Sequence, residues 1–369
     1  RETSNAASEA TVGDQQEEES LVTSLSELLQ QAFRCRASDL HLTAGMAPVF
    51  RVDGCLVSTS LAKLAPQEMA AFAQEIMTEE QWDQYQARGE LDFPYSVPGV
   101  GRLRVNAFRQ RGSDALAFRT VPLVPPTLEE LAMPSALKEL ALRNHGLVLV
   151  TGPSGSGKST TLAAMISEIN SHRSCHIITL EDPIEFLHQH NQSIINQREI
   201  GRDTKTYASG LRAALRADPD VIMIGEMRDL ETISIAITAA ETGHLVLSTL
   251  HTKGAARTID RIVDVFPPHQ QTQIKLQLSN VLVSIVSQQL LPRLDREGRV
   301  AALEVLIATP AIRNLIREGK THQLESMIQI GASYGMITMD KSLANFYRQG
   351  VISCEQALVH ANDPTCLSN

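Results

Sequence analysis

The spacing of apolar residues changes near residue 146 and divides the chain into two regions. Up to about residue 121, strand-like runs are mixed with segments of helical spacing. From about Gly146, short apolar runs alternate with helical segments, the pattern of a parallel sheet wound with helices. The second region therefore predicts an α/β domain. Its expected strands are 147–151, 176–181, 220–225 and 244–249, and the chain is expected to be mostly helical after Pro310.

Residues 20–121 carry the signals of a small α+β domain. A first helix is expected where apolar residues recur at helical spacing, at Leu21, Leu25, Leu28, Leu29 and Ala32. Two further helices are expected between Pro66 and Ala87. Strands are expected at Asp39–Thr43 and Pro48–Val52, before a hairpin turn at Asp53-Gly54, and at Arg102–Phe108 and Ala115–Val121 around a turn at residues 111–114.

Two segments lie outside these domains by their composition. Residues 1–19 are polar and acidic, so a disordered tail is expected there. Residues 122–145 begin with Pro122, Pro125 and Pro126, which indicates a linker region. The second domain is then expected to span residues 146–369, with a helical subdomain from about residue 310.

Composition and charge narrow the classes of function. Of 369 residues, 43% are hydrophobic and 20% charged, which is typical of a globular protein long enough for two cores. No apolar run approaches the ~20 residues that span a bilayer, and residues 1–20 lack the apolar core of a signal peptide. Direct membrane insertion is therefore not expected. The net charge of −9 argues against a surface-wide nucleic-acid groove, although a ring pore can be locally basic. Five scattered cysteines without a C-x-x-C pair indicate a reducing cytoplasm and no cysteine-based zinc site.

The segment Gly152–Ser159 matches the phosphate-binding P-loop pattern G-x-x-x-x-G-K-[ST] at every fixed position. An expected strand precedes it and an expected helix, Thr160–Asn170, follows it, which disfavours the alternative of an ordinary glycine turn. Such a turn aims backbone N–H groups and a helix N-terminus at an anion. Lys158 adds charge for the β- and γ-phosphates, and the Ser159 hydroxyl can ligate Mg²⁺. The residues expected to bind the nucleotide, ATP, are Gly152, Ser154, Gly155, Ser156, Gly157, Lys158, Ser159 and Thr160.

Two apolar runs end in acidic residues. The first ends in Glu181 and Asp182, which would lie on the rim where ligands bind in a parallel sheet. They can hold Mg²⁺ through water or polarise an attacking water, and the alternative is a helix cap ahead of Pro183. The second run, from Asp220, ends in Glu226 and resembles a Walker B strand with Gly225 at the usual metal-holding position. Glu226 is therefore expected to act as metal ligand, to orient water, or both, unless it is a solvated strand-end carboxylate.

Two histidines and a group of arginines carry weaker signals. His244 and His251 bracket the expected strand 245–250, where one histidine is more often structural, but two can sense a γ-phosphate. Five arginines crowd the paired strands of the first domain, namely Arg102, Arg104, Arg109, Arg111 and Arg119. They form either a solvated face or a set of contacts to a nucleotide held by another subunit or domain.

Four boxes in this order resemble the secretion-ATPase superfamily of hexameric P-loop motors, which drive type IV pili and type II secretion. They are the P-loop, the acidic box Leu180–Glu185, the segment ending in Gly225-Glu226, and the histidine box Glu241–Thr252. Gly225 is usual in this family. Three further segments resemble the pilus-retraction branch, which serves twitching motility: Ser38–Leu42, Gly225–Thr232 and Ala311–Glu318. The resemblance runs from about residue 22 to 360.

The resemblance implies a fold, an activity and partners. It implies a PAS-like N-terminal domain and a RecA-like ATPase domain in a homohexamer, with ATP and Mg²⁺ at a subunit boundary. Arg104 and Arg119 match two positions that contact the nucleotide, Arg109 is a weaker candidate, and Glu181 would assist Glu226. The implied place is cytoplasmic, peripheral at the inner membrane, with a pilus platform protein and a paralogous retraction ATPase as partners.

Other functions stay open on the sequence. An accessory retraction ATPase or an assembly ATPase of the same superfamily is the nearest alternative, although no tetracysteine zinc module, usual in assembly ATPases, is present. A nucleic-acid motor is disfavoured by the acidic balance and the lack of an aromatic and basic stripe. A nucleotide switch without turnover is disfavoured by an intact Glu226.

Overall fold

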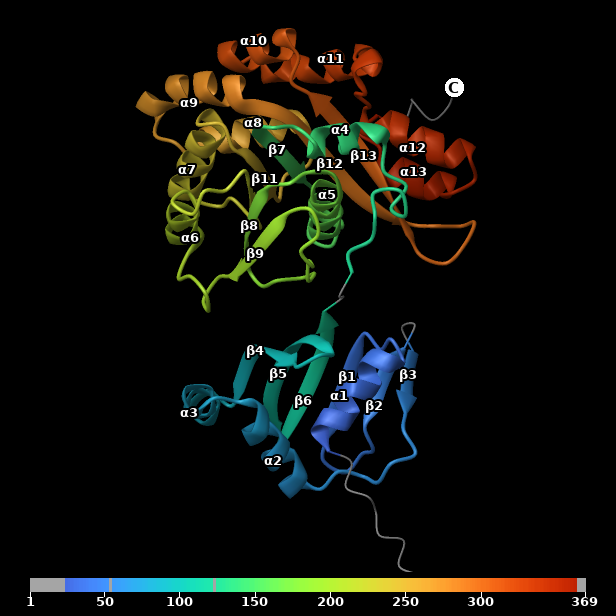
Figure 1. The fold of residues 1–369 in the computed structure, drawn as a ribbon. Helices are drawn as coiled ribbons and strands as arrows, with labels where there is room; N and C mark the ends of the chain where they lie inside the picture. The colour runs from blue at the N-terminus through green and yellow to red at the C-terminus, as the bar shows by residue number, and fades with distance from the viewer. Residues whose placement is uncertain (1–23, 53–54, 122–123, 364–369) are drawn as a thin grey trace, which may run out of the picture. The chain divides into compact units, whose positions relative to one another are not determined.

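The computed structural model describes residues 24–52, 55–121 and 124–363, which fold into two compact units (Figure 1). The first unit ends at Val121. Four expectations lie outside the described residues: the acidic tail, Leu21 in the first helix, the turn at Asp53-Gly54, and Pro122 at the start of the linker region. Among the described residues, no helix is long and apolar enough to cross a membrane.

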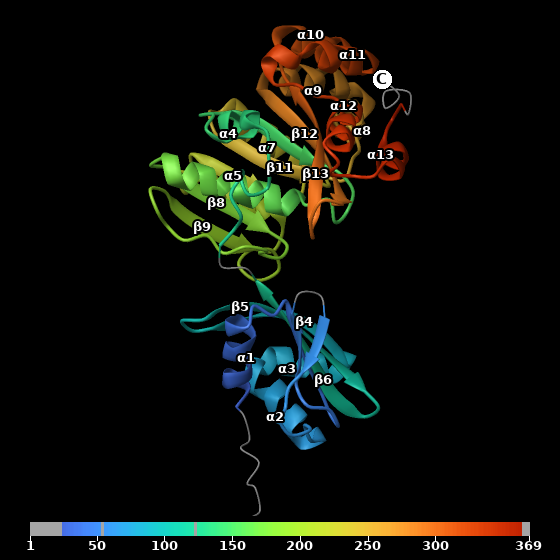
Figure 2. The same ribbon diagram turned by 90° about the vertical axis from the view of Figure 1, so that its right-hand side faces the viewer.

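The first unit is a six-stranded antiparallel sheet with three helices (Figure 2). The strand order is β3-β2-β1-β6-β5-β4. The strands are β1 (Asp39–Thr43), β2 (Val49–Val52), β3 (Cys55–Ser58), β4 (Glu90–Val97), β5 (Gly101–Gln110) and β6 (Ser113–Val121). The helices are α1 (Leu25–Arg34), α2 (Pro66–Ile76) and α3 (Glu79–Arg88).

Local sequence explains the elements of this unit. Helix α1 begins at a capping box in which the Ser24 hydroxyl accepts from the Glu27 N–H and the Glu27 carboxylate accepts from the Ser24 N–H. Strand β5 alternates, with Leu103 buried in the core and Arg104 on the opposite face. The expected four-residue turn is shorter, because Arg111 and Gly112 both adopt positive φ and β6 begins at Ser113.

The second unit is a seven-stranded sheet in the order β13-β12-β7-β11-β10-β8-β9, parallel except for the β12–β13 pair. Its strands are β7 (Gly146–Thr151), β8 (His176–Glu181), β9 (Ile194–Glu199), β10 (Val221–Ile224), β11 (Leu245–Leu250), β12 (Leu282–Pro292) and β13 (Arg299–Ile307). Its α-helices are α4 (Ser135–Ala141), α5 (Lys158–His172), α6 (Tyr207–Ala214), α7 (Leu230–Glu241), α8 (Ala255–Asp264), α9 (Pro268–Val281), α10 (Pro310–Glu318), α11 (Leu324–Ile330), α12 (Met339–Arg348) and α13 (Cys354–His360).

Helices cover both faces of the second sheet, which confirms the predicted parallel α/β architecture (Figure 1). On β7, Leu147 and Leu149 join the core made with α7, α8, α9 and α10. Val148 and Val150 join the opposite core, made with α4 and α5. Burial on both faces explains why the strand is an unbroken apolar run rather than an alternating one.

The structure differs from the expected organisation in three places. Residues 124–145, expected to form a linker, include α4 and bury Leu137 and Leu140 in a core of the second unit. The helix after the P-loop begins at Lys158 rather than Thr160, because Gly157 ends the loop with a φ of +87°. Strands β3, β4, β9, β12 and β13 were not expected from the sequence.

Candidate nucleotide-binding and catalytic site

Three loops of the second unit meet at one edge of the sheet. Strands β7, β11 and β10 are adjacent and parallel, so their carboxyl ends share that edge. The P-loop follows β7, His251 follows β11 and Glu226 follows β10. The structure therefore brings together three of the regions in which the sequence placed chemistry.

The P-loop begins at a glycine that no other residue can replace without displacement. Gly152 has a φ of +144°, and a Cβ there would lie 2.2 Å from the carbonyl oxygen of Gln288 on β12. The hydroxyls of Thr151 and Ser156 are buried without a partner, two of only four such side-chain atoms among the described residues. An unsatisfied buried polar group costs about 1–3 kcal/mol, so the loop fits a ligand that supplies partners.

Lys158 folds back over the loop. Its Nζ donates to the carbonyl oxygens of Gly152 and Pro153 at 2.9 and 3.0 Å, and the residue is 8% exposed. Burial lowers the pKa of the Lys158 amine, and the carboxylates of Glu226 and Glu185 oppose that shift. The ammonium is thus held at the P-loop by carbonyls and nearby negative charge.

A chain of polar contacts joins the three loops. His251 Nδ1 lies 3.4 Å from Lys158 Nζ, and His251 Nε2 lies 3.4 Å from Glu226 Oε1. The other Glu226 oxygen, Oε2, accepts from Arg228 Nη2 at 2.7 Å. A neutral imidazole with its hydrogen on Nε2 satisfies both of its contacts, accepting from the ammonium and donating to the carboxylate.

Glu226 is held as a partly accessible carboxylate, with its side chain 15% exposed. Burial alone would raise the pKa of Glu226, but the hydrogen bonds from Arg228 and His251 and the positive charge of Arg228 outweigh it, so the pKa is lowered. The preceding Gly225 is fixed by hydrogen bonds to Leu180 and Thr249. A Cβ on Gly225 would lie 2.9 Å from the Tyr207 hydroxyl and 3.2 Å from the Leu180 carbonyl oxygen, so the aspartate of an ordinary Walker B strand would require these neighbours to shift.

The adjacent acids Glu181 and Asp182 lie in different environments. Glu181 is buried, and its Oε1 accepts from Thr179 Oγ1 at 2.6 Å and Gln197 Nε2 at 3.0 Å. Asp182 is exposed at the start of the following loop. Burial raises the pKa of Glu181, which its hydrogen bonds only partly offset.

Replacing Glu181 by glutamine is expected to stabilise the protein in a pH-dependent way. The folded-state pKa of Glu181 is above its ordinary 4.5, so its contribution to stability is complete below that value and lost as pH rises through the folded-state pKa. Glu181→Gln removes the buried charge, so its Tm should exceed that of the wild type at pH 7.5 and approach it at pH 5. Each kcal/mol gained in the free energy of unfolding corresponds to a rise in Tm of about 2–4 °C. Thermal unfolding at both pH values measures the difference, with Glu185→Gln, an exposed neighbour, as control. An equal shift at both pH values contradicts the prediction.

His244 is not at this edge. It precedes β11, so its backbone lies at the opposite edge of the sheet, about 20 Å from the end of that strand. Its Nδ1 is 2.9 Å from the carbonyl oxygen of Ala239, near the end of α7. The two histidines expected to act together are therefore separated within one subunit by the length of a core strand.

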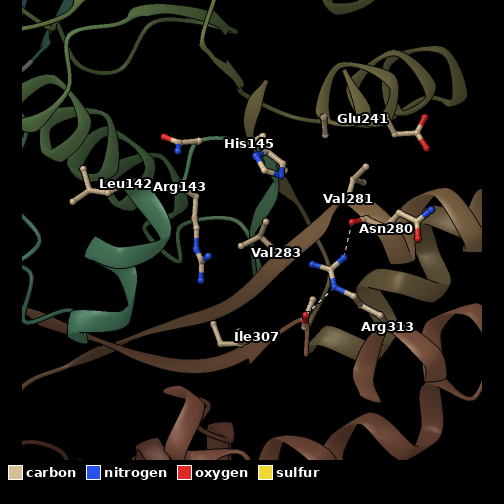
Figure 3. A pocket seen from close by; sticks show the side chains of 13 residues that line it. Leu142, Arg143, His145, Glu241, Asn280, Val281, Val283, Ile307 and Arg313 are labelled. Atoms are coloured by element: carbon tan, nitrogen blue, oxygen red, sulfur yellow. Dashed lines mark hydrogen bonds between the residues drawn. The ribbon is translucent and has the colours of Figure 1, made fainter. Parts of the chain in front are cut away.

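A cavity of about 760 Å³ lies at that opposite edge, and Arg143, His145 and Arg313 are among its lining residues (Figure 3). Arg313 belongs to the segment 311–318, which forms most of α10. Its guanidinium donates to the carbonyl oxygens of Ala308, Ser279 and Asn280. A cation at the last carbonyls of α9 is favourable for the helix dipole, so Arg313 ties α10 to α9.

The first unit places two of the candidate arginines side by side. Arg104 on β5 and Arg119 on β6 are direct cross-strand partners on the face opposite the core. Arg119 Nε donates to Asp39 Oδ1 at 2.9 Å, yet the arginine side chain is 70% exposed. The two guanidinium groups therefore share one face of the sheet, with the Asp39 carboxylate beside Arg119. Arg109, in contrast, contacts Gln86 and lies over the Tyr85 ring.

The structure adds residues that the sequence analysis did not single out. Gln288 contacts the P-loop, Gln197 and Tyr207 lie beside the acidic loops, and Arg228 binds Glu226. The signal for Gln288 was a polar pair, Gln288-Gln289, inside an apolar run of β-branched and leucine residues. Arg228 was visible only as part of the segment that follows Glu226.

Together these features define a P-loop nucleotide-binding domain of the RecA-like class, preceded by a small α+β domain. The family model of type II/IV secretion system proteins matches residues 14–359, and the chain belongs to this family. It is 50% identical over 340 residues to the type IV pilus retraction ATPase PilT of Pseudomonas aeruginosa, covering 92% of this chain and 98% of that protein.

A solved structure supports the same relationship. The crystal structure of the pilus retraction motor PilT with bound ADP matches with a TM-score of 0.86 and 49% identity, covering 94% of this chain and 99% of that one. The type IV pilus ATPase PilU of P. aeruginosa is 43% identical over 325 residues, covering 88% of this chain and 85% of that protein. The predicted membership of the secretion-ATPase superfamily is confirmed.

Proposed function

We propose that this chain is an ATPase that powers retraction of type IV pili in twitching motility. The observation that carries this conclusion is the meeting of Lys158, His251 and Glu226 at one sheet edge, behind a complete P-loop. The similarity to PilT over nearly the full length of both chains supports retraction in particular. The higher identity to PilT than to PilU favours the main retraction motor over an accessory one.

The P-loop amides and Lys158 bind the phosphates of ATP. The Ser159 hydroxyl, with Glu226 and the exposed Asp182, would hold Mg²⁺, which neutralises phosphate charge when bound. Among the described residues, no three carboxylate, histidine or cysteine side chains form a closed metal site. That fits Mg²⁺, which keeps several waters and is usually shared between one or two protein groups and phosphate oxygens.

Glu226 orients the attacking water and accepts its proton as the oxygen bonds to the γ-phosphorus and ADP leaves. Its lowered pKa keeps it ionised at neutral pH, and its side chain is partly accessible. Glu181 is buried, with hydrogen bonds to both of its oxygens. We assign Glu181 the assisting role, because a carboxylate so enclosed is less able to approach water. His251 would sense the nucleotide through its contact with Lys158, while a role for His244 requires transmission along β11.

Arg104 and Arg119 would place positive charge on the phosphates of a nucleotide bound by a neighbouring subunit. Their cross-strand pairing and the exposed Arg119 side chain support this role. The complete motor would be a homohexamer, cytoplasmic and peripheral at the inner membrane. It would act on the pilus platform protein and share the work with a paralogous retraction ATPase.

The proposed function is tested first by measuring the rate of ATP hydrolysis and the molecular mass of the assembly. Purified protein in ATP–Mg²⁺ buffer should hydrolyse ATP as a hexamer, lose activity in excess EDTA, and be unaffected by added DNA or RNA. Cells that lack the protein should assemble pili but fail to retract them. Stimulation by nucleic acid would indicate a nucleic-acid motor instead. Tight ATP binding by a monomer that does not turn over would indicate a nucleotide switch.

Leu315→Ala is expected to leave ATP hydrolysis within about twofold of wild type and to abolish pilus retraction in cells. On α10, Ile312 and Ile316 are fully buried, whereas Leu315 is only partly buried and packs against the edge of the same core. Truncating Leu315 therefore creates no large core cavity. It removes apolar surface that can make contacts needed for pilus retraction. Ile316→Ala is the matched comparison, because a buried truncation costs about 2–5 kcal/mol and should lower the Tm. Normal twitching by Leu315→Ala cells would show that this residue only packs.

A further inference from the structure

Gln288 is a buried amide directly behind the P-loop. It lies on β12, the strand next to β7, and is 1% exposed. Its Nε2 donates to the carbonyl oxygen of Ser156 at 2.6 Å, across 132 residues of chain. Its Oε1 accepts from the hydroxyl of Thr161 at 2.9 Å, in the first turns of α5. One side chain therefore binds both the end of the P-loop and the start of the helix that follows it.

The orientation of the Gln288 amide is determined by its partners. The Ser156 carbonyl can only accept, so the nitrogen of the amide must face it. The oxygen then faces the Thr161 hydroxyl, which is itself fully buried. Because the peptide group is planar and trans, directing the Ser156 carbonyl toward β12 points the next backbone N–H, that of Gly157, in the opposite direction. In a P-loop, backbone N–H groups directed into the concave face of the loop are the groups that bind phosphate.

Two glycines of the loop lie close to Gln288. A Cβ on Gly157 would lie 2.8 Å from Gln288 Nε2, and one on Gly152 would lie 2.2 Å from the Gln288 backbone oxygen. The first and the sixth residue of the motif are thus both set against the same residue of β12. Close backbone approach of this kind transmits a shift in β12 directly to the loop.

We propose that Gln288 is a positioning residue for nucleotide binding, which holds the P-loop in the conformation that receives the phosphates. This inference rests on the proposed function, since it assumes that the P-loop binds ATP and ADP. Gln288 does not touch the nucleotide in this role. It acts through the Ser156 peptide and Thr161, and its contribution is to keep the free loop already arranged for binding.

The neighbouring residue supplies a matched control. Gln289 follows on the same strand, is partly buried, and points to the opposite face, where its Oε1 lies 2.6 Å from His360 Nδ1 on α13. Replacing it by leucine removes a hydrogen bond of the same kind without touching the P-loop. General loss of stability in β12 would affect both variants, whereas loss of loop positioning would affect only Gln288→Leu.

The test is the affinity for ADP, measured by calorimetry on the full-length wild type, Gln288→Leu, Gln289→Leu and Thr161→Val. Without the Gln288 hydrogen bonds, the P-loop is expected to adopt its binding conformation a tenth of the time or less. The apparent Kd of Gln288→Leu for ADP then rises about tenfold or more. Thr161→Val, which is nearly isosteric, should weaken binding by about fivefold, the effect of one hydrogen bond. Gln289→Leu should bind as the wild type does. The KM for ATP should rise with Kd, while kcat at saturating ATP changes less.

The outcomes distinguish a failure of the proposed function from a failure of the positioning role of Gln288. A wild type that binds no ADP contradicts the proposed function itself. Normal affinity in Gln288→Leu, or equal losses in Gln288→Leu and Gln289→Leu, overturns the positioning role while leaving the proposed function intact. If Gln288→Leu does not fold, Thr161→Val decides alone, and wild-type affinity in that variant overturns the inference.

Discussion

Alanine in place of Arg119 is expected to lower kcat by about 10³-fold or more while ATP still binds. An arginine that reaches the γ-phosphate from outside the P-loop contributes ~10³–10⁵ in rate, because it neutralises charge that develops as the phosphoryl group transfers. In this structure the Asp39 carboxylate orients the Arg119 guanidinium, and most of the side chain remains exposed. ATP affinity and single-turnover rates of the variant separate an effect on ATP binding from an effect on the chemical step. Arg102→Ala, two residues before Arg104 on the same face, is the control for simple loss of charge.

A mixing experiment shows whether Arg119 acts on its own subunit or on a neighbour. Arg119→Ala subunits keep an intact P-loop, and Lys158→Ala subunits keep an intact Arg119. If the arginine acts in trans, rings mixed from the two inactive variants contain functional sites and recover part of the activity. If mixed rings stay inactive, the arginine acts within its own chain or not at all. A kcat near that of the wild type in Arg119→Ala alone would contradict any catalytic role for Arg119.

Glu226→Gln is expected to reduce ATP turnover by about 10²–10⁴-fold, the range for loss of a general base, without loss of ATP binding. Glutamine keeps the shape of the side chain but cannot accept a proton from water. It also weakens the contact with Arg228, a charge-assisted hydrogen bond in the wild type. The measurement is steady-state hydrolysis beside nucleotide affinity. Glu231→Gln serves as control, because its exposed ion pair with Arg212 lies in the same segment but away from the P-loop.

The outcome also distinguishes the roles of Glu226 and Glu181. If Glu226→Gln retains most activity and Glu181→Gln loses it, their proposed roles are reversed. A large loss in both, with additive free energies in the double variant, would indicate independent roles. A double variant no worse than Glu226→Gln would indicate that the two carboxylates act as one unit.

The sequence predicted what depends on local pattern. The apolar runs at 147–151 and 220–225 gave strands because parallel strands buried on both faces need such runs. The P-loop was recognisable because its glycines and its lysine stand at fixed spacing. Strand β12 was missed because it follows α9 without a turn signal, and Ser284, Ser287 and Gln288 interrupt its apolar run. Those polar side chains are satisfied by partners far away in the chain, which periodicity does not show.

The chemistry of the site was predictable only in part. Glu181 and Asp182 are adjacent in sequence, and nothing local distinguishes them, yet one is buried by Thr179 and Gln197 and the other is exposed. Gly225 was visible in the sequence, but the atom that crowds this position, the Tyr207 hydroxyl, comes from the start of α6. The pairing of Arg104 with Arg119 follows from the register of two strands, which the two-residue turn at Arg111-Gly112 sets.

The position of β12 beside β7 also has a consequence for synthesis on the ribosome. Ser156 and Gln288 are 132 residues apart, so at ~5–20 residues per second the P-loop leaves the ribosome about 7–26 s before its partner strand. Until β11 is made, β7 lacks both of its neighbours, and until β12 is made it still has one unpaired edge. Such an edge can pair with another chain. The growing polypeptide therefore passes through an interval in which this unpaired edge makes it prone to aggregation.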